Sequence, residues 1–338
     1  MRVAELRSTI RGHSKEQLEL LVVELYKAMP KALKEERDID ALVRSPDAQE
    51  VRRVKSAKKE ALDFDSVADE ARTFIDYALR QYYFAPNMYV PKRERPKWRF
   101  IAKRLYRNLV QCAADAENLE EAADLVEELY KLLRKACGVY LFNTEDPFSS
   151  VGIPQAEFLH QVLALRNRHM DKDLFVRKAI ALAADGTSSL WLYDSDIFFV
   201  VLEFLIIPDL KRSAIAAARE LIAERKRACS KERDSHKRFD IERSVNNLAK
   251  VAFHCYAQLS EFEEGIEFFN THCIDKDEEV KLYVIVRSLA DSYNQPTLIL
   301  DQITEAMAKG VRPRPTLIEL AKSIEHSLRE TNRHPTAH

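Results

Sequence analysis

The spacing of apolar residues predicts helices along almost the whole chain. In residues 14–29, Leu18, Leu21, Val22 and Leu25 recur three or four positions apart. This spacing places them on one face of a helix, because an α-helix repeats every 3.6 residues. We find no run of strictly alternating residues long enough to indicate a strand. The same helical spacing relates Val67, Ala71, Phe74, Ile75 and Leu79, and again Leu125, Leu129, Leu132 and Leu133.

Capping residues and prolines indicate where several of these helices begin and end. Ser14 with Gln17 three residues later forms the pattern of a capping box, and Pro30 ends the helix that follows. Pro96 stands where a helix through KWRFIAKRLYRNLVQCA can begin. Further helices are predicted at 3–11, 119–137, 155–169, 172–185, 190–206, 209–235, 240–259, 261–272, 276–292, 296–309 and 315–330. The expected fold is therefore all-α.

Two stretches interrupt the helical pattern. Residues 44–60 are polar and charged, which is typical of a linker or an exposed helix. Residues 138–154 contain two of the six glycines and two prolines, with no helical period. We therefore expect an N-terminal helical domain at 1–140, a linker or loop at 141–154, a second helical domain at 155–330 and a frayed tail at 331–338.

The small number of glycines supports this fold class. The chain has 6 glycines in 338 residues, far below the usual share of about 7%. Folds rich in hairpins need glycine for turns with positive φ, whereas long helices with short connections do not. The sequence also contains neither GxGxxG nor GxxxxGK[ST], which excludes the common phosphate-binding loops.

Charge and cysteine content narrow the function classes. Lys and Arg number 53 against 54 Asp and Glu, so any nucleic-acid binding would need a local patch rather than bulk charge. The five cysteines form no CxxC pair, which favours a reduced, cytoplasmic location. The N-terminus lacks the apolar core of a signal peptide. The most apolar run, SLWLYDSDIFFVVLEFLIIPDL, is broken by acids, so we expect a buried core helix and no membrane span.

Part of the second half resembles known helical repeats. The segment LAKVAFHCYAQLSEFEEGIEFFNTHC resembles a tetratricopeptide-type helix hairpin, in which small residues of one helix face large residues of the other. The residues that carry this resemblance are Ala252, Phe253, Tyr256, Gly265 and Phe269, with Leu289, Ala290 and Tyr293 recurring about 37 residues later. The end MAKGVRPRPT is similar to the close of a pentatricopeptide repeat.

This resemblance covers residues 240–330, or about two repeats. It implies stacked antiparallel helix pairs, that is, an α-solenoid whose concave surface binds a partner. The chain lacks the first-helix Trp and terminal Pro of the tetratricopeptide pattern. It also lacks a regular array of polar base-reading positions, so base-by-base reading of RNA is not implied.

The first half, from Leu6 to Arg166, resembles a bacterial family of uncharacterised helical proteins. The shared features are the opening ELRSTIRGHSKEQLELLVVELYK, the basic stretch before and within the 97–113 helix, and the segment YLFNTEDPF. This family resemblance implies a folded domain and no particular chemistry.

The basic stretch YVPKRERPKWRFIAKRLYRNLV is the strongest candidate for a binding site. It holds eight cations and one Glu, and most of its aromatic side chains fall on the apolar side of a helix. Three interpretations are open: a solvated helix face, a contact to phosphates or an acidic protein, and neutralisation by the acidic face Glu117–Glu128. The candidate residues are Lys92, Arg93, Arg95, Lys97, Arg99, Lys103, Arg104 and Arg107.

Other reactive side chains have simpler interpretations. The second basic stretch, 224–238, contains acids that favour an exposed helix with internal ion pairs. The pairs His254-Cys255 and His272-Cys273 match no metal-site spacing and are expected at helix contacts. Asp171, Asp194 and Ser195 occupy cap-like positions, and Glu145-Asp146 is an isolated acidic pair in a loop. No catalytic residue, metal or cofactor is therefore expected.

These observations favour a non-catalytic binding or scaffold protein that holds a partner protein. The first alternative is binding of RNA or DNA through the basic segment 92–107. The second alternative is an enzyme with a dispersed site that no motif indicates.

Overall fold

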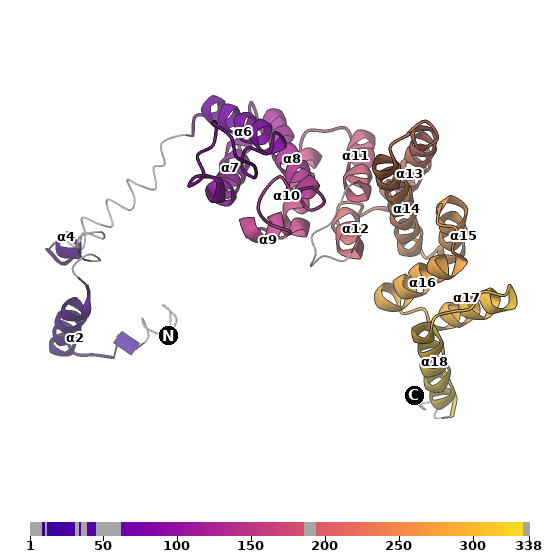
Figure 1. Ribbon diagram of the computed structural model, residues 1–338. Coiled ribbons are helices and arrows are strands. Elements are labelled where there is room, and N and C mark those ends of the chain that lie inside the picture. The colour runs from indigo at the N-terminus through magenta and orange to yellow at the C-terminus, as the bar shows by residue number, and fades with distance from the viewer. Residues whose placement is uncertain are drawn as a thin grey trace. The chain divides into compact units, whose positions relative to one another are not determined.

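The computed structural model describes residues 9–10, 12–30, 34, 39–44, 62–185 and 194–333. The chain divides into two compact units, residues 1–62 and 63–338. Every regular element in the described residues is helical and none is a strand, which confirms the all-α prediction (Figure 1). Among the same residues, no helix has the length and apolar character needed to cross a membrane.

The first unit is described through two helices, α2 (Lys15–Ala28) and α4 (Ile39–Arg44). The predicted capping box is confirmed, because the Ser14 hydroxyl accepts the Gln17 N–H and the Gln17 side chain accepts the Ser14 N–H. The Tyr26 hydroxyl donates to Asp40 Oδ1 at 2.5 Å, which joins the two helices. No residue of α2 is buried. Most of the predicted helix at 3–11 and the stretch 45–60 lie outside the described residues.

The second unit begins with three mutually packed helices: α6 (Phe64–Leu79), α7 (Trp98–Cys112) and α8 (Leu119–Ala136). A short 3-10 turn, η1 (Arg95–Lys97), leads into α7 and carries Pro96. The apolar stripes predicted for these helices are largely buried, with Phe74 at 2% exposure. Trp98 stacks on Phe142 with ring centroids 3.9 Å apart, which fixes the start of α7 against the segment after α8.

The segment after α8 contains a helix that the sequence pattern does not predict. Helix α9 (Pro147–Val151) has only five residues and begins where the Asp146 carboxylate accepts the Ser149 N–H at 3.0 Å. Phe148 is buried, and α9 packs against α7 and α8. Residues 141–154 therefore lie within the second unit and contribute to its core.

The rest of the second unit is a succession of helices, most of which pack against the next helix or the next but one along the chain (Figure 1). These helices are α10 (Gln155–Asn167), α11 (Lys172–Ala184), α12 (Asp194–Leu202), α13 (Pro208–Cys229), α14 (Ser235–Gln258), α15 (Phe262–His272), α16 (Glu278–Ser288), η2 (Leu289–Tyr293), α17 (Pro296–Ala308) and α18 (Pro315–Arg333). Helix α14 packs against both α13 and α15. The predicted helix at 209–235 is too long, because α13 ends at Cys229. A new helix, α14, begins after Asp234, whose side chain caps it by accepting the N–H groups of His236 and Lys237.

A buried ionic cluster joins α8, α10 and α11. Glu127 is 3% exposed and Arg166 is 4% exposed, and Glu127 Oε2 accepts the Arg166 Nε–H at 2.7 Å. Lys131 lies 2.6 Å and Lys178 3.0 Å from the Glu127 carboxylate, and Asp124 pairs with Arg166. Burial raises the pKa of Glu127, but the surrounding cations outweigh it and the net shift is downward.

The hairpin of α14 and α15 is held by a close approach at Gly265. A Cβ atom at Gly265 would lie 2.9 Å from Tyr256 Cβ and 3.3 Å from Phe253 Cδ2. Only a residue without a side chain fits there, which is the role the sequence pattern predicts for a small residue. On the other side of α14, buried His254 shares a 2.8 Å hydrogen bond with the Tyr293 hydroxyl, which ties α14 to η2.

Candidate anion-binding sites

The eight cations predicted as a site lie around the start of the second unit. Lys92 and Arg93 precede η1, Arg95 and Lys97 belong to it, and Arg99, Lys103, Arg104 and Arg107 are on α7. Steps of four residues relate Arg99, Lys103 and Arg107, so these three share one side of α7. Their role as a binding site stays a prediction.

Carboxylates neutralise only part of this positive charge. Glu94 lies 3.4 Å from Arg93 and 2.8 Å from Lys97, and Glu70 accepts from Arg104 at 2.8 Å. Arg95 and Lys103 instead donate to carbonyl oxygens, of Val90 at 3.1 Å and of Gly152 at 3.3 Å, which leaves their charge uncompensated. Within the described part of the chain, no carboxylate pairs with Lys92, Arg99 or Arg107.

The acidic face Glu117–Glu128 does not neutralise the basic segment, so that interpretation is wrong. Glu121 pairs with Arg72, and Glu127 pairs with cations of α8, α10 and α11. The reason is geometric. Glu121, Asp124 and Glu127 of α8 pair with cations of α6, α10 and α11. Arg104 of α7 pairs instead with Glu70 of α6.

One aromatic side chain of α7 lies on the solvent side. Trp98, Leu105 and Leu109 are buried, as the stripe predicts. Phe100 is 62% exposed, and the Arg99 guanidinium lies 4.9 Å from the centre of its ring. The exposed side of α7 therefore combines cations with an accessible ring.

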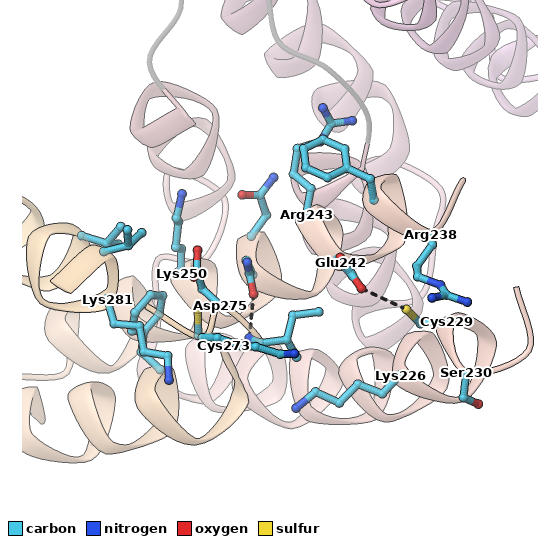
Figure 2. A pocket seen from close by; sticks show the side chains of 18 residues that line it. Lys226, Cys229, Ser230, Arg238, Glu242, Arg243, Lys250, Cys273, Asp275 and Lys281 are labelled. Atoms are coloured by element: carbon cyan, nitrogen blue, oxygen red, sulfur yellow. Dashed lines mark hydrogen bonds between the residues drawn. The ribbon is translucent and has the colours of Figure 1, made fainter. Parts of the chain in front are cut away.

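A second positively charged site is a groove of about 1030 Å³ formed by α13, α14, the residues after α15, and α16 (Figure 2). We call it the basic groove. It is lined by Lys226, Cys229, Ser230, Arg238, Phe239, Glu242, Arg243, Asn246, Asn247, Lys250, Phe269, Cys273, Ile274, Asp275, Lys276, Val280, Lys281 and Val284.

Cations outnumber acids in this lining by six to two. Several have partners: Arg243 pairs with Asp240 at 2.8 Å, and Lys281 pairs with Glu278 at 2.8 Å. No carboxylate in the described residues pairs with Lys226 or Lys276. Of the two acids in the lining, Glu242 contacts the Cys229 thiol at 3.8 Å rather than a cation.

Polar groups in the groove wall have uneven hydrogen bonding. Asn246 Oδ1 accepts the Ile274 N–H at 2.8 Å, which fixes the residues after α15 against α14. The buried Arg243 Nε–H has no hydrogen-bond partner. An unpaired buried donor carries a desolvation penalty of about 1–3 kcal/mol.

Burial and the lysines of the groove together set the pKa shifts of two groups at the end of α15. Burial raises the pKa of the Cys273 thiol, while Lys281 and Lys250 act in the opposite direction. Burial also lowers the pKa of His272, and Lys226 adds to this decrease. Lysines from three different helices therefore act on adjacent residues at the end of α15.

The basic groove is not predicted from the sequence, although the stretch 224–238 contributes to it. This stretch is predicted to be an exposed helix with internal ion pairs. Most of its residues are exposed, but it is divided between α13 and α14, and the predicted internal pairing is wrong for Glu224 and Arg225. Glu224 pairs with Arg177 and Arg225 pairs with Asp185, because both side chains point toward α11 and its end. Of the other cations in this stretch, Lys226 and Arg238 line the groove.

The other candidate groups have structural roles. His254 and Cys255 are buried, and Asp171 and Asp146 cap α11 and α9. Among the described residues, no three His, Cys, Asp or Glu side chains are grouped as a metal site. Asp194 and Ser195 lie at the start of α12. Comparison with protein-family models, curated proteins and solved structures finds no match to this chain.

Proposed function

We propose that this chain is a non-catalytic binding protein whose stacked, tetratricopeptide-like helices hold a partner protein. In this proposal the basic groove takes an acidic segment of that partner. The observation that carries the proposal is the excess of six cations over two acids in one groove, with Lys226 and Lys276 lacking a carboxylate within the described residues.

Charge makes an acidic occupant more favourable than a neutral or basic one. Cations that face one another without counter-charges repel, and a carboxylate that enters between them gains Coulomb energy and hydrogen bonds. Arg243 and Lys281 already pair with Asp240 and Glu278, so their charge attracts a ligand less strongly. Lys226 and Lys276 are the cations expected to pair with the occupant.

The groove also offers apolar surface to its occupant. Val280 and Val284 of the lining are half-buried, and Phe239, also in the lining, is 61% exposed. An occupant that carries only charge would leave this surface in contact with water. A segment that places apolar side chains between its acids would bury it, at about 25 cal/mol for each Å² of apolar surface.

The size of the groove and the charge of the chain favour a short protein segment over a long nucleic acid. Binding pockets for compact ligands span about 300–1,000 Å³, and the groove, at about 1030 Å³, is close to the upper limit of this range. The net charge of the whole chain is only −1, so no broad positive field extends the groove along a polyanion.

The test uses two fluorescent peptides of eight residues, one alternating Glu with Leu and one alternating Lys with Leu. Fluorescence anisotropy with the full chain should show binding of the Glu-Leu peptide and none of the Lys-Leu peptide. Replacing both Lys226 and Lys276 with Gln should weaken binding roughly 5–30-fold, since a charge-assisted contact contributes about 0.5–1 kcal/mol at a partly exposed site.

Lys309→Gln is the matched control. It removes one exposed cation at the C-cap of α17, where Lys309 pairs with Glu305 outside the basic groove, and it should leave binding unchanged. Equal binding of the two peptides, or equal loss in the control and groove variants, would refute the proposal. Displacement of the peptide by an oligonucleotide at lower concentration would count in favour of a nucleic-acid ligand for this groove.

A further inference from the structure

We infer that the exposed side of α7 is a second, separate site that binds single-stranded nucleic acid. The site consists of Arg99, Phe100, Lys103 and Arg107, and we call it the α7 face. Its chemistry is that of a stacking platform with phosphate-binding cations around it, which is the usual composition of sites for single strands.

The helix geometry brings these four side chains together. Arg99, Lys103 and Arg107 follow at steps of four residues, and Phe100 is three residues from Lys103 and seven from Arg107. With a rise of 1.5 Å per residue, the two arginines lie about 12 Å apart along the axis. This length gives room for more than one nucleotide between the outermost cations.

The charge of the α7 face is available to a ligand. Lys103 donates to the Gly152 carbonyl, which leaves its positive charge uncompensated. Arg99 and Arg107 pair with no carboxylate in the described residues, whereas neighbouring Arg104 is bound to Glu70. Three cations of one helix side therefore lack a counter-charge, and phosphates are the complementary partner.

The exposed ring distinguishes nucleic acid from an acidic protein. Phe100 is 62% exposed on a side of the helix that is otherwise charged, while Trp98, Leu105 and Leu109 of the apolar stripe face the core. The Arg99 guanidinium lies over one face of the ring, 4.9 Å from its centre, so a base is expected to stack on the opposite face. Bases must be unpaired to stack in this way, so a single strand is expected to bind better than a duplex.

The experiment measures anisotropy of fluorescein-labelled oligouridylate of ten nucleotides with the full chain. If about three phosphates are neutralised, a slope of −0.7 per phosphate predicts roughly 20-fold weaker binding at 200 mM than at 50 mM salt. Replacing Arg99 and Arg107 with Gln should reduce the salt slope by about 1.4. Phe100→Ala should weaken binding at least about 5-fold, the factor expected for one stacked base.

Two controls separate this site from general electrostatics and from the basic groove. Arg80→Gln removes an exposed cation of the same part of the fold that already pairs with Asp76, and it should have no effect. The variant with Lys226 and Lys276 changed to Gln should also bind oligouridylate normally. Circular dichroism of each variant confirms the fold, which these surface changes should preserve.

Three results would overturn the inference. One is the absence of salt-sensitive binding, and another is loss of binding in the groove variant instead of the α7 variants. The third is equally tight binding of polyglutamate that is insensitive to Phe100→Ala, because an acidic protein surface would then be the better partner.

Discussion

Replacing Gly265 with Ala tests the close approach of α14 and α15. The new Cβ would lie 2.9 Å from Tyr256 Cβ and 3.3 Å from Phe253 Cδ2. Contacts this short require the two helices to separate, because Tyr256 Cβ is attached directly to the backbone and cannot rotate away.

The expected loss of stability follows from two opposing effects. Alanine is about 1 kcal/mol more favourable than glycine inside a helix. Overpacking of a close contact typically costs about 1–3 kcal/mol, and the rigid position of the obstructing atom favours the upper part of this range. We therefore expect Gly265→Ala to lower the free energy of unfolding by about 1–2 kcal/mol.

Urea unfolding followed by far-ultraviolet circular dichroism measures this change. Hydrogen exchange of the amides in α14 and α15 shows whether the loss is local to the hairpin. Glu264→Ala, on the exposed side of α15, is the matched control and should change stability by less than about 0.5 kcal/mol. If Gly265→Ala were instead more stable by about 1 kcal/mol, helix propensity alone would account for it and the close packing would be refuted.

Three further predictions concern buried polar groups. Burial lowers the pKa of His254 to about 4. The neutral side chain should therefore stabilise the fold fully above about pH 6.5, and this stabilisation should be lost as the pH falls toward 4. His254→Gln should remove up to roughly 3 kcal/mol of this pH dependence of the unfolding free energy, measured by urea titration. Tyr293→Phe should cost about 1 kcal/mol at pH 7 by removing the hydrogen bond to His254, and no change would show that this bond does not stabilise the fold. Glu127→Gln should cost about 3–5 kcal/mol in the same assay, because Arg166 keeps only one acid, while exposed Glu128→Gln should cost little.

The helical fold could be predicted largely from the sequence, because helix contacts are local in the chain. Apolar residues at three- and four-residue steps indicated the helices, and most predicted limits lie within a few residues of those observed. Helix α9 was missed because five residues are too short to show a period, and its cap at Asp146 was interpreted as part of a loop pair. The end of α13 was missed because its charged residues continue without a break into α14.

The candidate sites were less predictable, because they depend on which side chains meet across helices. The exposed ring of the α7 face could be predicted from the sequence, since Phe100 falls outside the apolar stripe of Trp98, Leu105 and Leu109. The basic groove was not, since Lys226, Lys250 and Lys281 come from three helices and no local pattern relates them. Ion-pair partners could not be predicted either, because they are far apart in the chain. Arg104, for example, pairs with Glu70, 34 residues earlier.

The ionic cluster around Glu127 has a consequence for dividing the protein into fragments. A fragment that starts at Gln155 would retain Arg166 and Lys178 but lose Glu127 and Asp124, the carboxylates that hold them. In that fragment the Arg166 guanidinium would lie beside the newly exposed apolar side of α10 without a counter-charge. Such a fragment should be insoluble or recruit anions from the buffer, whereas one that begins at Asp63 keeps the acids and bases of the cluster on the same polypeptide.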